Sequence, residues 1–140
     1  MELADAIGFA RGRSHGVLTT IRRDGRPQLS NILYVFDEDA ARISITDSRI
    51  KTRNLRRDPR AALYVPGESF WAYVVLDGTV ELSSVATEPG DEVVEDLIRL
   101  YRDARGEEHP DWDEFRQAMV SEGRVLARLR PTSAYGLVRE

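Results

Sequence analysis

HGVLTTIRRDGRPQLSNILYVF, residues 15–36, is the stretch that decides the fold of this 140-residue chain. Residues 15–23 have a two-residue period and are rich in β-branched side chains, which favours a strand. Asp24-Gly25 follows, and this pair is typical of a two-residue hairpin turn. Residues 28–36 then carry apolar side chains on both faces, as a covered barrel strand does. The stretch therefore predicts an antiparallel hairpin that forms part of a barrel.

Further segments with strand-like alternation follow the hairpin. They are expected at residues 42–46, 60–65, 70–82, 124–129 and 134–138. Gly78 lies inside the longest segment, where a bulge or bend is the usual reason for a glycine. Pro131 separates the last two segments, because proline has no N–H to donate to a strand ladder. Long, bent strands of this kind are suited to a barrel.

Helices are expected between these strands. Residues 2–11 predict a short amphipathic helix, and residues 87–122 predict two more. Residues 49–58 predict a helix that is capped by Asp47-Ser48 and ends before Pro59. Strands and helices do not alternate regularly, which disfavours a parallel sheet. We expect one mainly β (β+α) domain over residues 1–140, a six- to seven-stranded antiparallel split barrel with flanking helices.

The composition is that of an ordinary globular domain. Hydrophobic residues make up 41% and charged residues 31% of the chain. The absence of cysteine excludes disulfides, thiolate nucleophiles and cysteine-ligated zinc. Residues 1–11 lack a basic region followed by an apolar run, and no segment approaches the length of a membrane span. We therefore expect a cytoplasmic protein without a membrane or metal partner.

Charge is distributed unevenly along the chain. The net charge is −4, yet residues 49–60 contain six basic residues and one acidic residue, whereas residues 88–122 contain twelve acidic and four basic residues. Lys51 is the single lysine among 20 basic residues, and its ammonium is a compact point charge unlike a guanidinium. A basic helix that follows a strand offers backbone N–H groups, a favourable dipole and cations to one anion, and phosphate is the natural ligand.

Other interpretations of this basic segment remain open. Charge alone favours a solvated helix whose arginines pair with the acidic helices, with Lys51 retained by chance. The segment can also be a docking surface for a partner. Nucleic acid fits poorly, because the net charge is negative and no aromatic residues are interleaved. No nucleophile elbow, zinc-binding helix motif or phosphate loop is present, so no catalytic residue is assigned and any chemistry would depend on a cofactor.

Three motifs carry a resemblance to a known family. Arg26–Asn31 (RPQLSN), Ile45-Thr46 and Ser48–Asn54 (SRIKTRN) are similar to the pyridoxamine 5′-phosphate oxidase-like split-barrel superfamily. Within it, the chain most resembles the small deazaflavin-dependent oxidoreductases of the B type, with close matches at 53–61 and within 101–119. The resemblance covers about residues 15–136 and implies the FMN-binding split-barrel fold.

The resemblance also implies a homodimer with two cofactor clefts at the subunit interface. In the family, the strand that matches residues 28–31 runs beside the flavin-like ring, and the stretch that matches residues 46–54 holds the phosphate, with Lys51 at the position of the phosphate-binding lysine. Trp71 and Tyr73 would come from the other subunit, although packing as core aromatics explains them equally well. The expected cofactor-binding residues are Gln28, Ser30, Asn31, Thr46, Lys51, Thr52, Arg53, Asn54, Arg56, Arg57, Trp71 and Tyr73.

The implied cofactor is the deazaflavin coenzyme F420, with FMN as the alternative. F420 continues beyond its phosphate into a polyglutamate tail, and Arg53, Arg56 and Arg57 supply more positive charge than one phosphate needs. Residues 130–140 lack the Arg-x-His motif of the true pyridoxamine phosphate oxidases, which argues against that reaction. The expected function is transfer of a hydride from reduced F420 to an electron-poor small-molecule acceptor. An FMN-binding oxidoreductase and a non-catalytic F420 carrier are the alternatives.

Overall fold

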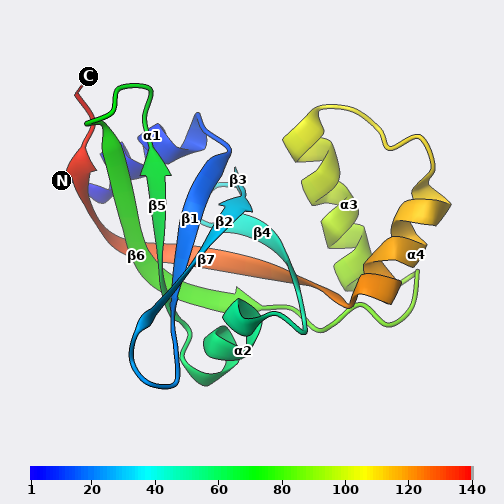
Figure 1. The fold of residues 1–140 in the computed structure, drawn as a ribbon. Coiled ribbons are helices and arrows are strands. Elements are labelled where there is room, and N and C mark those ends of the chain that lie inside the picture. Colours follow the sequence, from blue (N-terminus) through cyan, green and yellow to red (C-terminus); the bar gives the residue numbers. More distant parts are fainter. Residues whose placement is uncertain (140) are drawn as a thin grey trace.

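The computed structural model describes residues 1–139 and confirms a mainly β fold with flanking helices (Figure 1). The strands of these residues form one antiparallel sheet in the order β2-β1-β5-β6-β7-β4-β3. The elements, in chain order, are α1 (Leu3–Arg11), β1 (His15–Ile21), β2 (Pro27–Leu33), β3 (Val35–Phe36), β4 (Ala41–Thr46), α2 (Ile50–Arg57), β5 (Arg60–Pro66), β6 (Tyr73–Leu82), α3 (Glu92–Arg105), α4 (Trp112–Glu122) and β7 (Arg124–Leu137).

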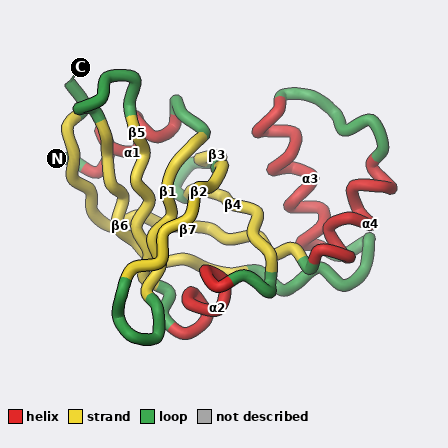
Figure 2. The backbone as a smooth tube through the Cα atoms, in the orientation of Figure 1, coloured by secondary structure: helices red, strands yellow, loops and turns green. Residues whose placement is uncertain are grey.

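The sheet curls into a split barrel. Figure 2 shows the strands wrapped around a common interior, with the helices outside them. β2 is one edge of the sheet and β4 is next to the other edge, yet the two strands approach each other in space. The predicted hairpin is present, because β1 pairs with β2 over residues 15–21 and 27–33. Its turn is not the predicted two-residue one: the Arg22 N–H donates to the carbonyl oxygen of Arg26 at 2.8 Å, so three residues form the loop, of which Gly25 alone has a positive φ, of 87°. The barrel therefore almost closes between β2 and β4, and this opening is the split.

The barrel interior is filled by alternate side chains of its strands. Leu18, Leu63, Leu76 and Leu129 are fully buried there, as the two-residue period of the strands predicts. Helix α1 packs on β6, β7 and β3, and its Ala6 and Ala10 belong to the same core. The Tyr34 hydroxyl donates to the carbonyl oxygen of Ala10 at 2.6 Å, and burial raises the pKa of Tyr34.

The α3–α4 hairpin has a second core and projects from the barrel (Figure 1). Val94, Leu97 and Ile98 of α3 are buried against Leu126 of β7, with the α4 side chains Trp112, Phe115, Met119 and Val120 partly buried beside them. Arg42 of β4 joins the two parts, because its guanidinium donates to Asp103 of α3 at 2.9 Å. The predicted packing stripes of both helices are confirmed.

Pro131 does not divide the last strand, so the prediction of two strands was wrong. β7 runs without a break from Arg124 to Leu137, and its pairing with β6 shifts register at Asp77/Gly78. This is the bulge predicted at Gly78. A Cβ at Gly78 would lie 2.1 Å from the carbonyl oxygen of Arg130. Pro131 is tolerated because it sits at this bulge, where the ladder is already interrupted.

Two other local predictions also differ from the structure. The return strand is split at Tyr34 into β2 and β3, and its outer side chains Leu29 and Leu33 are exposed rather than covered. β6 begins at Tyr73 rather than at residue 70, because residues 67–72 form a turn in which the N–H of Gly67 and the carbonyl oxygen of Ala72 are hydrogen bonded at 2.7 Å. A run of aromatic residues favoured a strand at 70–72, but the turn hydrogen bond replaces the ladder there.

Candidate cofactor site

A cavity of ≈ 340 Å³ opens at the split of the barrel. β2, β4, α2 and the first residue of β7 contribute its walls, so it collects segments that are far apart in the sequence. Its lining residues are Gln28, Ser30, Ser44, Ile45, Thr46, Arg49, Ile50, Lys51 and Arg124. Four of these were expected from the sequence, namely Gln28, Ser30, Thr46 and Lys51.

The β2 wall is polar on the face that otherwise points to the core. Ser30 is opposite Leu18 and Gln28 is opposite Thr20 in the β1–β2 register, and both of these partners are fully buried. The Ser30 hydroxyl oxygen is buried and has no hydrogen-bond partner among residues 1–139. An unpartnered buried hydroxyl is costly, so this atom is suited to a hydrogen bond with a bound molecule.

The turn from β4 to α2 forms the opposite wall. The Thr52 hydroxyl donates to the carbonyl oxygen of Thr46 at 2.6 Å, and the Arg49 N–H donates to the same carbonyl at 3.1 Å. The Asp47 N–H donates to the carbonyl oxygen of Gly123 at 2.9 Å, which ties this turn to the start of β7. These bonds hold the first turn of α2 against the cavity.

The N-terminus of α2 has no side-chain cap. The structure places the N-cap at Arg49, whose side chain makes no capping hydrogen bond, so the predicted cap by Asp47-Ser48 was wrong. The Asp47 carboxylate instead accepts from Arg56. The first-turn N–H groups of a helix have no partner within the helix and attract anions. Ile50 and Lys51 of this first turn line the cavity.

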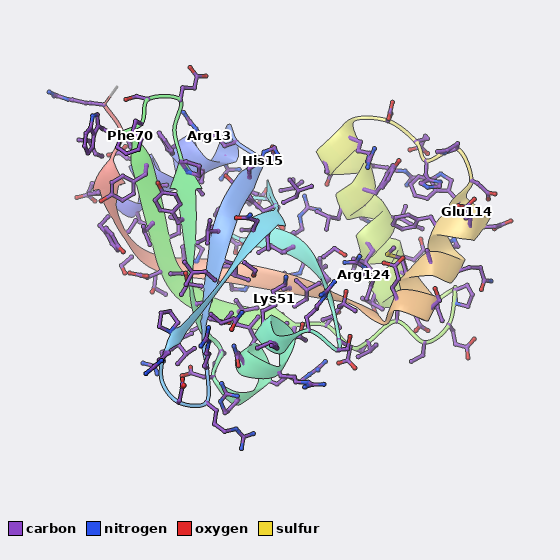
Figure 3. The ribbon with its side chains drawn as sticks, viewed as in Figure 1. Arg13, His15, Lys51, Phe70, Glu114 and Arg124 are labelled. Atoms are coloured by element: carbon purple, nitrogen blue, oxygen red, sulfur yellow. The ribbon has the colours of Figure 1, made fainter. Side chains whose placement is uncertain are left out.

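Three cations surround the cavity, and we refer to Arg49, Lys51 and Arg124 as the cavity cations. No carboxylate is among the residues that line it. Desolvation by burial is the main cause that lowers the pKa of Lys51, and the charges of Arg49 and Arg124 lower it further. Figure 3 shows Lys51 and Arg124 at the same end of the barrel. The cavity is thus an electropositive space that lacks a counter-charge on its walls.

The remaining predicted residues of α2 lie away from the cavity. Thr52 and Asn54 are buried beneath it, and the Asn54 amide donates to the Thr20 hydroxyl at 3.1 Å. We refer to Arg53, Arg56 and Arg57 as the outer arginines, because all three are exposed. Arg56 pairs with Asp47, and Arg57 donates to the carbonyl oxygen of Ile21 at 2.5 Å and to Asn54 at 3.0 Å. The structure therefore brings together only part of the predicted cofactor set.

Three more predicted residues lie outside the cavity of this chain. Asn31 is on the outer face of β2, because it alternates with Gln28 and Ser30. Trp71 is 71% exposed in the β5–β6 turn, and Tyr73 stacks on Tyr64 with ring centroids 5.6 Å apart. The neighbouring Phe70 lies at the end of the barrel opposite Lys51 (Figure 3). Trp71 and Tyr73 are therefore not core aromatics around the cavity, and their assignment to a second subunit remains a prediction.

Sequence reasoning missed five cavity residues, namely Ser44, Ile45, Arg49, Ile50 and Arg124. Arg49 and Ile50 belong to the recognised basic segment, and their place in its first turn was the available signal. Arg124 has no local signal. It reaches the site because it pairs with Thr46 in the β4–β7 register, across 78 positions of sequence.

Other kinds of site find no support among residues 1–139. No group of three or more histidine, cysteine or acidic side chains is arranged to hold a metal ion. None of the helices has the length and apolar character needed to cross a bilayer.

Fold and cavity together define a split-barrel protein with a polar, electropositive cavity at the split. A family model described as pyridoxamine 5′-phosphate oxidase matches residues 8–137. The chain belongs to this family.

Solved structures agree with this fold at low sequence identity. An F420 reductase is 24% identical with a TM-score of 0.62, and the match covers 91% of this chain and 94% of the other. A putative pyridoxamine 5′-phosphate oxidase from Listeria innocua is 20% identical with a TM-score of 0.68, over 99% and 100% of the two chains. The heme storage protein HutZ from Vibrio cholerae is 17% identical with a TM-score of 0.67, over 96% and 93%. These likenesses establish the split-barrel fold.

Proposed function

We propose that this protein binds the deazaflavin coenzyme F420 and transfers a hydride from its reduced form to an electron-poor organic acceptor. The observation that carries the proposal is the cavity at the split, where three cations and an uncapped helix N-terminus meet without a carboxylate in the lining. Such an arrangement is complementary to an anion. The similarity to a solved F420 reductase supports the choice of a deazaflavin over other anions.

The residues of the cavity fit a phosphate-bearing flavin-type cofactor. Lys51 and the first-turn amides of α2 would hold the phosphate, while the Ser30 hydroxyl and the Gln28 amide would hydrogen bond polar atoms of the ring. When bound, the reduced cofactor supplies the hydride, a proton with two electrons, and is itself oxidised as the acceptor is reduced. The protein contributes orientation and the electrostatic environment.

A homodimer is part of the proposal, and the outer face of the sheet supports it. Asn31, Val17, Tyr64, Val75 and Tyr135 are successive partners in one row across five strands. The next row ends in Leu33 at β2 and Leu137 at β7, which are 65% and 47% exposed. An apolar face that crosses five strands is typical of an interface between subunits. The proposal includes Trp71 or Tyr73 of a copy on this face as a contact to the other chain's cofactor.

Titration with F420 and FMN side by side tests the choice of cofactor. We expect tight binding of F420 and weaker binding of FMN, followed by absorbance or fluorescence of the ring. Tight binding of FMN without binding of F420 would contradict the proposal and favour an FMN-dependent oxidoreductase. Binding of neither cofactor would favour the basic segment as a docking surface for a partner.

Turnover separates an enzyme from a carrier. Reduced F420 is mixed with a panel of enones, quinones and tetrapyrroles, and its reoxidation is followed in the absence of oxygen. Acceleration over the protein-free rate by at least one acceptor is expected. Tight F420 binding without acceleration across the panel would support the carrier.

The assembly is tested with Leu33→Lys, which places a charge on the exposed face without touching the core. Sedimentation should show a dimer for the wild type and a monomer for the variant, together with weaker F420 binding. Ala104→Lys, which adds the same charge at an exposed position of α3, outside the sheet, is the matched control. A monomeric wild type with full cofactor affinity would contradict the shared cleft.

A further inference from the structure

We propose that Arg124 is a phosphate-binding residue of the cofactor site and forms, with Lys51, the two sides of a cationic clamp. The inference rests on the proposed function and deepens it, because it names a residue that determines affinity for the phosphorylated cofactor. Neither the basic segment nor its motifs contain this residue. Only the fold brings it to the cavity.

The backbone fixes the position of Arg124 from two directions. Arg124 begins β7 and lies opposite Thr46, the last residue of β4. Gly123, immediately before it, adopts φ 63° as the C-cap of α4 and accepts the Asp47 N–H at 2.9 Å. The β4–α2 turn and the start of β7 are therefore joined on both sides of the cavity wall. An arginine at this junction has little backbone freedom to leave it.

The Arg124 side chain is also held in place. Its Nε and one terminal nitrogen both donate to the same carboxylate oxygen of Glu122, at 3.0 and 2.8 Å. A guanidinium has five N–H donors, so three remain for a ligand after these two. Glu122 thus acts as a positioning residue, because it holds the planar fork of Arg124 without using all of its donors. Less rotamer entropy is then lost when an anion binds.

Electrostatics within the cavity lead to the same assignment. The charge of Arg124 is one of the causes that lower the pKa of Lys51, so the two cations are near enough to repel each other. Like charges that face one cavity raise the free energy of the empty site and are relieved when an anion lies between them. Arg124 and Lys51 reach the cavity from different elements, β7 and α2, so a phosphate would be gripped from both sides.

The outer arginines are less suited to this role. Ion pairing does not separate them from Arg124, because Arg56 pairs with Asp47 much as Arg124 pairs with Glu122. Their position does separate them. None of the outer arginines lines the cavity. A planar fork such as that of Arg124 can also bind phosphate through two parallel hydrogen bonds, which a lysine cannot do.

Arg124→Gln tests the clamp with pairs of ligands that differ in the phosphate. Affinities are measured for F420 and its phosphate-free deazaflavin nucleoside, and for FMN and riboflavin. We expect the variant to bind F420 and FMN about tenfold more weakly than the wild type does, because one charge-assisted hydrogen bond to the phosphate is lost. Its affinity for the two phosphate-free ligands should not change. Arg124→Lys keeps the charge but loses the planar fork, so its affinity for the phosphorylated ligands should lie between those of Arg124→Gln and the wild type.

Arg130→Gln is the matched control. It removes the same charge from the same strand, but Arg130 is exposed and pairs with Asp39 away from the cavity. Its affinities should equal those of the wild type, and thermal unfolding should show that all variants fold. An equal loss for phosphorylated and phosphate-free ligands, or no loss, would overturn the clamp while leaving the proposed cofactor intact. A wild-type protein that binds none of the four ligands would overturn both.

Discussion

Arg49 and Lys51, two of the cavity cations, lie in the same stretch of sequence as the outer arginines and carry the same charge, yet their surroundings differ. Arg56 and Arg57, two of the outer arginines, already have acceptors in Asp47, Ile21 and Asn54. Lys51, a cavity cation, has two other cations for neighbours and a lowered pKa. The comparison teaches that the position of a cation in the fold, on a cavity wall or outside it, indicates a binding site better than its place in a basic segment does. The charge of the segment, taken alone, does not distinguish the two groups.

The largest difference in F420 affinity between a cavity-cation variant and an outer-arginine variant is expected for Lys51→Gln and Arg53→Gln. Loss of Lys51 removes a charge-assisted hydrogen bond to the phosphate, so F420 affinity should fall by about 10- to 100-fold. Arg53 is exposed outside the cavity, and its loss should change affinity by less than about twofold. Equilibrium titration of both variants measures the difference. Equal effects would show that the whole segment, and not the cavity, binds the cofactor.

Asn54→Ala should separate stability from binding. Asn54 is 3% exposed, donates to the buried Thr20 hydroxyl and accepts from Arg57. Its removal leaves Thr20 without this donor, so the free energy of unfolding should fall by about 1–2 kcal/mol. Denaturant unfolding measures the loss. F420 affinity at 25 °C should remain close to that of the wild type. A loss as large as that of Lys51→Gln would show that Asn54 takes part in cofactor binding.

Alkaline pH should weaken binding through Lys51. The Lys51 pKa lies below its ordinary value of 10.5, mainly because of burial, so the ammonium loses its proton at a lower pH than other lysines do. Affinity for FMN or F420 should therefore begin to fall at a pH below the 10.5 expected of an ordinary lysine. Deprotonation of Lys51 also removes its burial cost as a cation and its repulsion by Arg49 and Arg124. The free energy of unfolding of the ligand-free protein should therefore rise with pH between the lowered pKa and 10.5.

The matched control for this pH dependence is Lys51→Arg. A guanidinium stays charged throughout the range, so the fall in affinity should be much smaller in this variant. The same fall in Lys51→Arg would assign the titration to the cofactor or to another group.

The smallest effect is expected from Arg56→Gln. Arg56 and Asp47 form a pair whose side chains are 42% and 45% exposed, and such pairs contribute less than about 1 kcal/mol. Thermal unfolding should therefore shift by only a few degrees, and F420 affinity should not change. A tenfold loss of affinity would show that Asp47, released from Arg56, alters the turn before α2.

Local patterns were enough to predict much of the fold. The β1–β2 hairpin and the bulge at Gly78 were predicted from a few neighbouring residues, and both are present. The turn of the hairpin has three residues, Arg23 to Gly25, rather than the predicted two. Pro131 misled the prediction because its effect depends on the opposing strand. A bulge in the β6–β7 pairing accommodates it, and one sequence segment cannot show that pairing.

The candidate site was predicted in part for the same reason. Lys51, Thr46, Gln28 and Ser30 belong to motifs, and they do line one cavity. Thr52 and Asn54 belong to the same motif but support it from beneath, because the helical period turns them toward the interior. Arg124 was missed because only the long-range register of β4 and β7 brings it to Thr46.

The register of β7 sets the position of side chains in the core, at the cavity and on the exposed apolar face at the same time. It pairs with β4 from Arg124 to Leu129 and with β6 from Ala127 to Leu137, and alternate side chains belong to the core, the cavity or the exposed apolar face. One residue inserted near Ala127 would turn the side chains on one side of the insertion to the opposite face of the sheet. Either Leu129 would leave the core, or Val125 would leave it and Arg124 would leave the cavity. An insertion of equal length between α3 and α4, at residues 106–110, would change the register of no strand. Length variation among natural relatives should therefore be frequent in that loop and absent from β7.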